Sequence, residues 1–265
     1  MKKSSGGSDS INSNQLRRRQ SVAKADGMHP RQNRVLGALS EREFKRLTPH
    51  LQLVPLERND SAYEPNRAIT HVYFPLNGII SVVTVMEDGT ELEAATVGNE
   101  GCVGIPVFLG SNKSSTKAFC QVPGMSVRIK REHFCRQAAS SEEFRNILRR
   151  YTEALLVQLA QTAACNAVHR VEQRCARWLL QTHDRMRGDH FTLTQEFLGG
   201  MLGVRRAGVS EACSRLQEQQ LIRYTRGVVE IIDREGLERA SCECYRATQK
   251  EFDRLLGPTS KRRTH

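Results

Sequence analysis

The sequence predicts an α+β fold in three parts: an N-terminal antiparallel β-roll, a long helix suited to dimerisation and a C-terminal winged helix-turn-helix. Three observations support this prediction. Short apolar runs between residues 51 and 130 alternate with turns that contain glycine. Residues 141–166 follow with one uninterrupted helical pattern. Residues 195–216, QEFLGGMLGVRRAGVSEACSRL, then combine two short helical patterns with small residues between them.

Length and composition indicate a cytoplasmic protein. A chain of 265 residues can form two domains with cores of their own. No stretch of about 18 apolar residues is present, so we expect no membrane partner, and the N-terminus lacks the apolar region of a secretory signal. The eight cysteines include no pair with CxxC spacing, which favours a reducing compartment and no metal site.

The charge of the chain is concentrated in its first residues. Residues 1–34 contain eight Lys or Arg and two Asp or Glu, and they supply +6 of the formal charge of +11. We expect this segment, and residues 258–265, to be disordered tails because both are polar and rich in basic residues. Residues 189–232 contain five charges of each sign. Net charge therefore supports nucleic-acid binding only weakly, and the helix-turn-helix pattern has to support it instead.

Residues 35–140 form the predicted β-roll. Ser40 begins a capping-box pattern, which predicts a short helix that ends before Pro49. Turn signals such as Asn77-Gly78 and Asp88-Gly89 separate the strand-like runs, and a short helix is expected over residues 131–138. The strand-like runs are residues 68–74, 79–86, 91–97, 118–122 and 126–129.

Residues 141–166 form the predicted dimerisation helix, with Ser141 as its N-cap. Its apolar stripe has near-heptad spacing, which favours a seam between two copies of the chain. The alternative is a helix that packs on its own β-roll. The residues assigned to the dimer interface are Leu148, Tyr151, Leu155, Gln158, Leu159 and Thr162.

Residues 167–257 form the predicted winged helix-turn-helix domain. Gly199 provides the small residue that two steeply crossing helices need, and Gly203 permits a positive φ in the turn. The second helix then directs four polar side chains outward, and adjacent guanidinium groups suit guanine edges and phosphates. The alternative is an ordinary helical hairpin with a surface arginine pair. The four outward residues are Arg205, Arg206, Ser210 and Glu211.

A β-hairpin follows the second helix and resembles the wing of a winged helix. Two short strand-like runs are joined through Thr225-Arg226-Gly227. Arg223 and Arg226 are positioned to contact the sugar-phosphate backbone of DNA. A final helix is expected from Asp233 to Leu256. Cys242 and Cys244 on it could form a redox-active pair or half of a metal site, but two residues apart on a helix they point to different faces, which favours ordinary helix positions.

The order of these parts resembles the Crp/Fnr family of bacterial transcription regulators. The resemblance covers roughly residues 35–240, and its most specific segments are LTQEFLGGMLGVRRAGVSEACSRLQEQQLIRY and VYFPLNGIISVV with the later GNEGCVG. It implies a cyclic-nucleotide-binding-like β-roll that receives a signal, and a homodimer that reads a palindromic site on double-stranded DNA. An activator of this family would also contact RNA polymerase.

The resemblance assigns a base contact to Arg206, where the recognition helix of the family usually places an arginine. The glutamate that follows in the catabolite-activator branch is replaced here by Ala207, and a later arginine of that branch is replaced by Glu211. A glutamate accepts a hydrogen bond from a cytosine amino group or repels phosphate. The target sequence should therefore differ from the one that branch reads.

The expected effector pocket departs further from the family. Glu100 and Gly101 lie near the place of the ribose-binding Gly-Glu pair, but in reversed order, and the phosphate-binding arginine has no match. Lys113, Ser114 and Lys117 occupy the corresponding turn, where a lysine would act only as a point charge. We therefore expect no cyclic nucleotide and predict no cofactor.

Other chemistries of the β-roll lack the residues that they need. The iron–sulfur sensors of the family use an N-terminal cysteine cluster, whereas this chain has no cysteine before Cys102. A metal-dependent enzyme on a β-roll needs several histidines, and residues 51–130 contain only His71. We therefore expect no enzyme. A signalling module that binds a ligand or protein without reading DNA remains the alternative.

Overall fold

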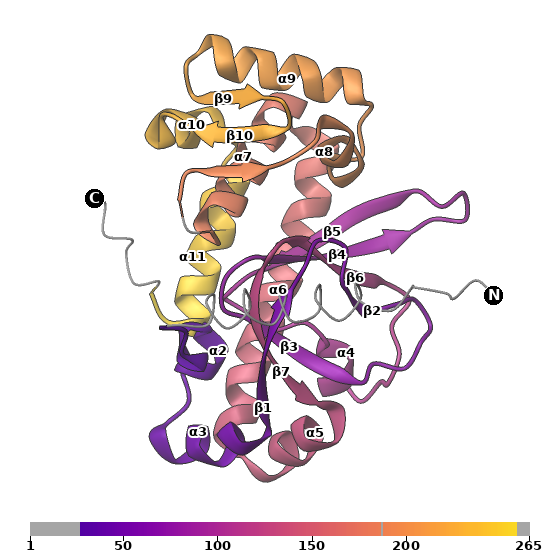
Figure 1. Cartoon of the computed structure of the whole chain (residues 1–265), viewed down its shortest axis with the longest axis vertical. Helices are drawn as coiled ribbons and strands as arrows, with labels where there is room; N and C mark the ends of the chain where they lie inside the picture. The colour runs from indigo at the N-terminus through magenta and orange to yellow at the C-terminus, as the bar shows by residue number, and fades with distance from the viewer. Residues whose placement is uncertain (1–26, 187, 259–265) are drawn as a thin grey trace, which may run out of the picture.

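The computed structural model describes residues 27–186 and 188–258. The β-roll forms one end of the molecule, the helix-turn-helix forms the other, and α6 runs between them (Figure 1). The tails predicted for residues 1–34 and 258–265 lie mostly outside the described residues. Among the described residues, no helix is both long enough and apolar enough to cross a membrane.

Residues 27–34 are folded, which corrects the predicted boundary of the N-terminal tail. They include η1 (Pro30–Gln32), and α2 (Arg34–Gly37) follows. Asn33 is fully buried, and its side-chain amide donates to the carbonyl oxygens of Pro75 at 2.9 Å and Gly101 at 2.7 Å. Its Oδ1 accepts from the first backbone amides of α2. These hydrogen bonds attach residues 27–34 to the β-roll. The polar composition of the segment gave no sign of this attachment.

The β-roll consists of two antiparallel sheets, as the glycine-punctuated strands predicted. One sheet has the order β1-β7-β3 and the other β2-β6-β4-β5. The short helix predicted after Ser40 is α3 (Glu41–Leu47), with η2 (Thr48–His50) after it, and the Ser40 side chain accepts from the Glu43 amide. The strands and remaining helices are β1 (Leu51–Leu56), β2 (Ser61–Tyr63), β3 (His71–Pro75), β4 (Ile79–Val85), β5 (Glu91–Val97), α4 (Ile105–Phe108), β6 (Lys117–Val122), β7 (Gly124–Lys130) and α5 (Arg131–Ser140).

The long helix is α6 (Glu142–Val168), and Ser141 is its N-cap, as predicted. Three of the residues assigned to a dimer seam are instead buried against the β-roll of the same chain, so this part of the assignment is wrong. The Tyr151 hydroxyl donates to the Cys102 carbonyl at 2.9 Å, and Gln158 Nε2 donates to the Thr96 carbonyl at 3.2 Å. Leu148 is completely buried beside them in the β-roll core.

The helix-turn-helix domain follows α6 directly. Its three-stranded sheet has the order β8-β10-β9, and its core joins α7 to the two helices of the motif. Cys175, Trp178 and Leu179 of α7 are buried in this core. The elements are α7 (Val171–Asp184), β8 (His190–Thr192), α8 (Gln195–Leu202), α9 (Arg206–Glu218), β9 (Ile222–Thr225) and β10 (Val228–Ile231).

The predicted final helix is two helices, α10 (Arg234–Ala240) and α11 (Cys244–Leu256). The chain reverses between them, and α11 packs along α6 toward the β-roll (Figure 1). Phe252 and Leu255 belong to the core of the β-roll, and the Phe252 ring lies 6.4 Å from that of Tyr151. The last helix therefore belongs to the β-roll body, although the sequence placed it in the domain of residues 167–257.

Candidate nucleic-acid interface

The turn between α8 and α9 has the geometry that its two glycines predicted. A Cβ on Gly199 would lie 2.9 Å from the Val204 carbonyl oxygen, which leaves no room for a side chain where the helices cross. Gly203 ends α8 with a φ of +64°, in the left-handed region that favours glycine. Val209, Ala212 and Leu202 are buried where the two helices face their common core.

The N-terminal turn of α9 presents its polar residues on the surface. Arg205 is the N-cap and Arg206 the first residue of the helix, and both side chains are exposed. Neither makes an ion pair with another described residue. Ser210 lies one turn further on the same side and is half-buried. Unpaired guanidinium groups at a helix N-terminus are suited to the acceptors of a DNA groove.

Glu211 is exposed on α9 but already has a partner. Its carboxylate accepts from Arg215 at 2.6 Å, one turn further along the helix, and Arg215 also lies 3.6 Å from Glu172 of α7. The Glu211 carboxylate is therefore engaged by Arg215 while the protein is free. A contact from Glu211 to a cytosine amino group stays a prediction, and it would compete with Arg215.

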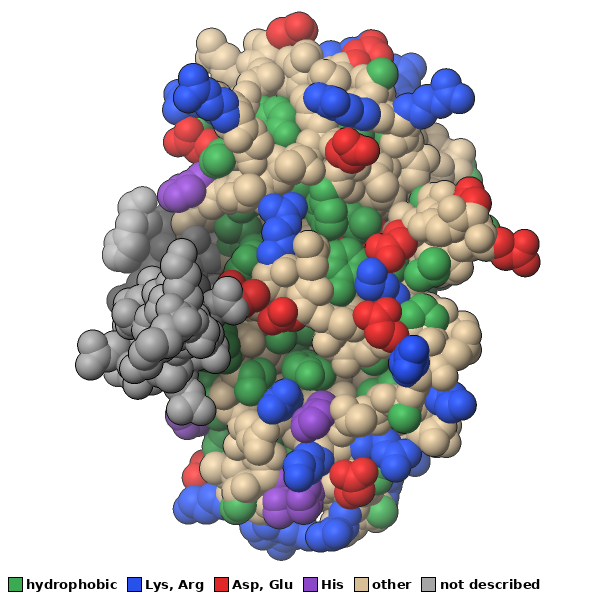
Figure 2. Space-filling model, turned by 45° about the vertical axis from the view of Figure 1, so that its right-hand side comes forward, with side chains coloured by type: hydrophobic (Ala, Val, Ile, Leu, Met, Phe, Trp, Pro, Cys, Tyr) green, Lys and Arg blue, Asp and Glu red, His purple; other side chains and the backbone are tan. Residues whose placement is uncertain are grey.

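The wing is a tight hairpin with Arg226 at its tip. Arg226 and Gly227 have φ values of +49° and +79°, as a two-residue type I′ turn requires. Arg223 faces Glu230 across the hairpin and donates to it at 2.7 Å, so it is less available to phosphate than Arg226. Figure 2 shows Lys and Arg side chains at this end of the molecule interspersed with Asp and Glu.

The predicted effector residues do not form a common pocket. Glu100 is buried, and Arg185 at the end of α7 donates to its Oε1 through Nε at 2.9 Å and Nη2 at 2.8 Å. Burial opposes this charge, but Arg185 and the Gly98 amide outweigh it and lower the pKa of Glu100. A Cβ on Gly101 would meet the Tyr151 ring. Both positions serve the packing of α6 and α7 on the β-roll, which corrects their assignment to a pocket.

The other three predicted effector residues lie on a different part of the β-roll. Lys117 pairs with Glu91 of the neighbouring hairpin at 2.8 Å, and Ser114 exchanges a hydrogen bond with Thr116 at 2.8 Å. Lys113 pairs with Ala68 through a backbone bridge. A groove of about 590 Å³ between β6, the β4–β5 hairpin and α8 includes Lys117, but neither Glu100 nor Gly101 lines it.

Glu93 of β5 connects the β-roll to α7. Trp178 Nε1 donates to one carboxyl oxygen at 2.9 Å, and the Ser81 hydroxyl donates to the other at 2.8 Å. Burial raises the pKa of Glu93 to about 7, although both hydrogen bonds and the nearby Arg177 and Arg185 act in the opposite direction. The folded protein therefore binds this proton more tightly than the unfolded chain does.

The variant Glu93→Gln should flatten the pH dependence of stability. Because the folded pKa exceeds the unfolded value, the contribution of Glu93 is fully present below about pH 4.5 and is lost as the pH rises through about 7. Glutamine stays neutral, and its Oε1 can accept from Trp178 while its Nε2 donates to the Ser81 hydroxyl oxygen. At pH 8 the variant should therefore be more stable than the wild type by up to about 3 kcal/mol. Urea denaturation between pH 5 and pH 8 measures this, with the exposed Glu87→Gln of the same hairpin as control. If the free energy of unfolding of Glu93→Gln changed with pH in the same way as that of the wild type, the prediction for Glu93 would be wrong.

A cluster of four potential metal ligands at the end of α6 is not apparent from the sequence pattern. Cys165 and His169 lie there beside Cys242 and Cys244, and their potential ligand atoms are all within 4.8 Å of one another. The prediction that the last two cysteines point to different faces of one helix is wrong, because Cys242 precedes α11. The spacing Cys165-x₃-His169, one turn on a helix, is the signal that could have found half of the cluster.

Comparison with known proteins identifies two domains in this chain. Residues 53–141 match the family model of the cyclic nucleotide-binding domain, and residues 173–240 match that of the Crp-like helix-turn-helix domain. Together the two matches span more than half of the chain and have the order that the structure shows. A comparison with curated protein sequences gives no match.

Several solved structures have the same fold. A regulator of the Crp/Fnr family from Eubacterium rectale has a TM-score of 0.61 and 14% identity, over 78% of this chain and 96% of its own. FixK2 from Bradyrhizobium japonicum has a TM-score of 0.60 and 16% identity, over 72% and 98%. The c-di-GMP-responsive regulator CLP from Xanthomonas campestris has a TM-score of 0.59 and 16% identity, over 72% and 99%. At these identities the likeness shows the fold.

Proposed function

The chain belongs to the Crp/Fnr family of transcriptional regulators, and we propose that it binds a palindromic DNA site as a homodimer under the control of a signal received by its β-roll. It is a sequence-specific DNA-binding regulator, and we assign it no catalytic step. If it activates transcription, it also contacts RNA polymerase. The alternative of a signalling module that does not read DNA loses its support, because the Crp-like helix-turn-helix is intact.

The exposed N-terminal turn of α9 is the main support for this proposal. Arg205 and Arg206 project from a helix whose other face is buried in the domain core, and Arg226 extends from the adjacent wing. This arrangement places base-reading side chains on the helix and a phosphate contact beside it. We therefore propose that Arg206 reads a base and that Arg226 positions the protein on the backbone.

The surface of α6 that faces away from the β-roll supports a dimer. Its apolar residues recur at intervals of three and four, and Leu156 is 60% exposed. This stripe replaces the buried Leu148, Tyr151 and Gln158 as the proposed seam. Leu155, Leu159 and Thr162 are half-buried, and Leu155 packs against the β-roll core. The stripe consists of Leu156, Ala160, Ala163 and Ala167.

Selection from a random duplex pool tests the proposal with the full-length protein. We expect a palindromic site that binds two chains per duplex in fluorescence anisotropy and light scattering, with affinity that falls linearly on a logarithmic salt scale. Enrichment of no sequence above the pool would contradict sequence-specific binding.

The variant Leu156→Glu tests the dimer seam separately. A charge at the centre of an apolar interface should convert dimers to monomers and weaken binding to the full palindrome. Leu109→Glu is the matched control, because Leu109 is 66% exposed on the β-roll and far from α6 in sequence. A dimer that survives Leu156→Glu unchanged would move the interface elsewhere without contradicting the DNA site.

A further inference from the structure

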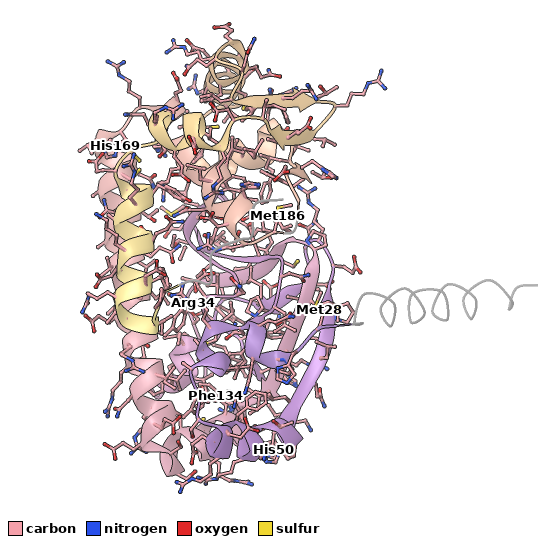
Figure 3. The ribbon with its side chains drawn as sticks, turned by 90° about the vertical axis from the view of Figure 1, so that its left-hand side faces the viewer. Met28, Arg34, His50, Phe134, His169 and Met186 are labelled. Carbon is pink, nitrogen blue, oxygen red and sulfur yellow. The ribbon has the colours of Figure 1, made fainter. Side chains whose placement is uncertain are left out.

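Three cysteines and one histidine meet where α6, the start of α11 and the joint before α7 come together. Cys165 and His169 are one turn apart, and His169 immediately follows α6. Cys242 and Cys244 come from the reversal between α10 and α11. The three cysteines are buried and His169 is half-buried. Figure 3 shows His169 beside the upper end of α11, next to α6.

The spacing of the four side chains fits one tetrahedral ion. At a Zn–S distance of about 2.3 Å, two sulfur ligands of a tetrahedral site lie about 3.8 Å apart. Here Cys165 Sγ is 3.5 Å from Cys242 Sγ, and Cys244 Sγ is 3.5 Å from His169 Nδ1. All four atoms lie within 4.8 Å of one another, so small side-chain adjustments would bring them around a single centre.

The groups around the cluster are those that support metal ligands. Glu243 Oε2 lies 3.2 Å from His169 Nε2, so the carboxylate can hold the imidazole with its proton on Nε2 and its lone pair on Nδ1. Nδ1 is the atom that faces Cys244. Gln161 Nε2 also donates to Cys244 Sγ at 3.0 Å, a bond that stabilises a thiolate.

The local charge also favours a thiolate-rich centre. Three thiolates and one neutral imidazole around Zn²⁺ carry one net negative charge. Arg174 and Arg177 of α7 lie within electrostatic reach of Cys165. Both are buried, and the Nε of each has no hydrogen-bond partner among the described residues. A negatively charged centre would offset the cost of burying these two cations.

We propose that Cys165, His169, Cys242 and Cys244 bind one Zn²⁺ as a structural Cys₃His site. Thiolate-rich tetrahedral sites select zinc among the common divalent ions, and four protein ligands leave no position open for catalysis. On binding, each cysteine thiol loses its proton to solvent and the sulfur donates to the metal. The ion would join α11 to the end of α6, two residues before α7 begins, and so hold the joint between the two domains.

Metal analysis of the untagged full-length protein tests this site. We expect elemental mass spectrometry to find one zinc per chain. After a chelator has removed the zinc, the protein should bind one Co²⁺ and show the absorption of a tetrahedral thiolate centre. Cys242→Ser should lose this stoichiometry, whereas Cys135→Ser, which removes an exposed cysteine on α5, should keep it. Circular dichroism shows whether each variant is folded.

A second variant tests the site without removing a ligand. Glu243→Gln should weaken Zn²⁺ affinity by about 10- to 100-fold in a competition titration, because it removes the carboxylate that orients His169. Failure of the reduced wild-type protein to bind either Zn²⁺ or Co²⁺ stoichiometrically would overturn the proposal. So would a Cys165–Cys242 disulfide in protein isolated under reducing conditions, or iron in place of zinc. None of these results depends on DNA binding.

Discussion

Replacing Arg206 with alanine should weaken binding to the selected palindrome while leaving binding to random DNA nearly unchanged. A bidentate contact between arginine and a guanine edge discriminates by about 1–3 kcal/mol, which corresponds to about five- to 150-fold in affinity for each contact. Arg206 is exposed at the start of α9 and makes no ion pair with a described residue, so its removal should cost the fold little.

The measurement is fluorescence anisotropy at one fixed salt concentration, with the selected duplex and a scrambled one. Arg136→Ala is the matched control, because Arg136 is exposed on α5 at the opposite end of the molecule. Arg226→Ala provides the contrast. Loss of a phosphate contact should weaken binding to both duplexes and reduce the slope of log affinity against log salt concentration by about one. If Arg206→Ala binds the selected duplex as tightly as the wild type, α9 does not read the site through this residue.

Replacing Arg185 with methionine should destabilise the protein by about 3–5 kcal/mol. The reason is the buried carboxylate of Glu100, which would lose its ion pair with Arg185 and keep backbone amide donors such as that of Gly98. Removing one member of a buried ion pair leaves the other charge without compensation, and this costs more than the pair itself contributes. Arg185 is the C-cap of α7 and Glu100 belongs to the β-roll, so the variant should also loosen the contact between the two domains.

Urea denaturation at pH 7 measures this effect, followed by both fluorescence and circular dichroism. The double variant Glu100→Gln with Arg185→Met should recover much of the loss, because no unpaired charge is then buried. Arg254→Met is the control for an exposed ion pair, and it should change stability by less than about 1 kcal/mol. Equal stability of Arg185→Met and the wild type would contradict the role assigned to this pair.

Local chemistry made the helix-turn-helix predictable. The close approach at Gly199 and the left-handed turn at Gly203 depend on residues within a few positions of each other. The N-caps Ser40 and Ser141 and the glycine turns of the β-roll are local in the same way. In each case one residue type meets a need of the nearby backbone, such as a positive φ or a hydrogen-bond acceptor for a free amide. The residue type is therefore enough to predict the local structure.

The face of α6 was predictable only in part. The spacing of the apolar residues indicated that one side of the helix is covered. It did not indicate whether a second chain or the β-roll covers that side. Tyr151 and Gln158 find their partners at Cys102 and Thr96, on strands and loops about fifty to sixty residues earlier. Burial by the same chain and burial by a partner produce the same helical pattern, so periodicity cannot distinguish them.

By itself, the sequence determined the order of the parts: a β-roll, a long helix and a winged helix-turn-helix whose exposed Arg206 is the base-reading residue that we propose. Only the tertiary structure decided what the buried polar groups contact. It placed Glu100 on Arg185 rather than in an effector pocket, and it brought Cys242 and Cys244 to Cys165 and His169. The physical reason is that backbone turns and helix periods are set by neighbouring residues, whereas ion pairs and metal ligands are set by which distant segments pack together.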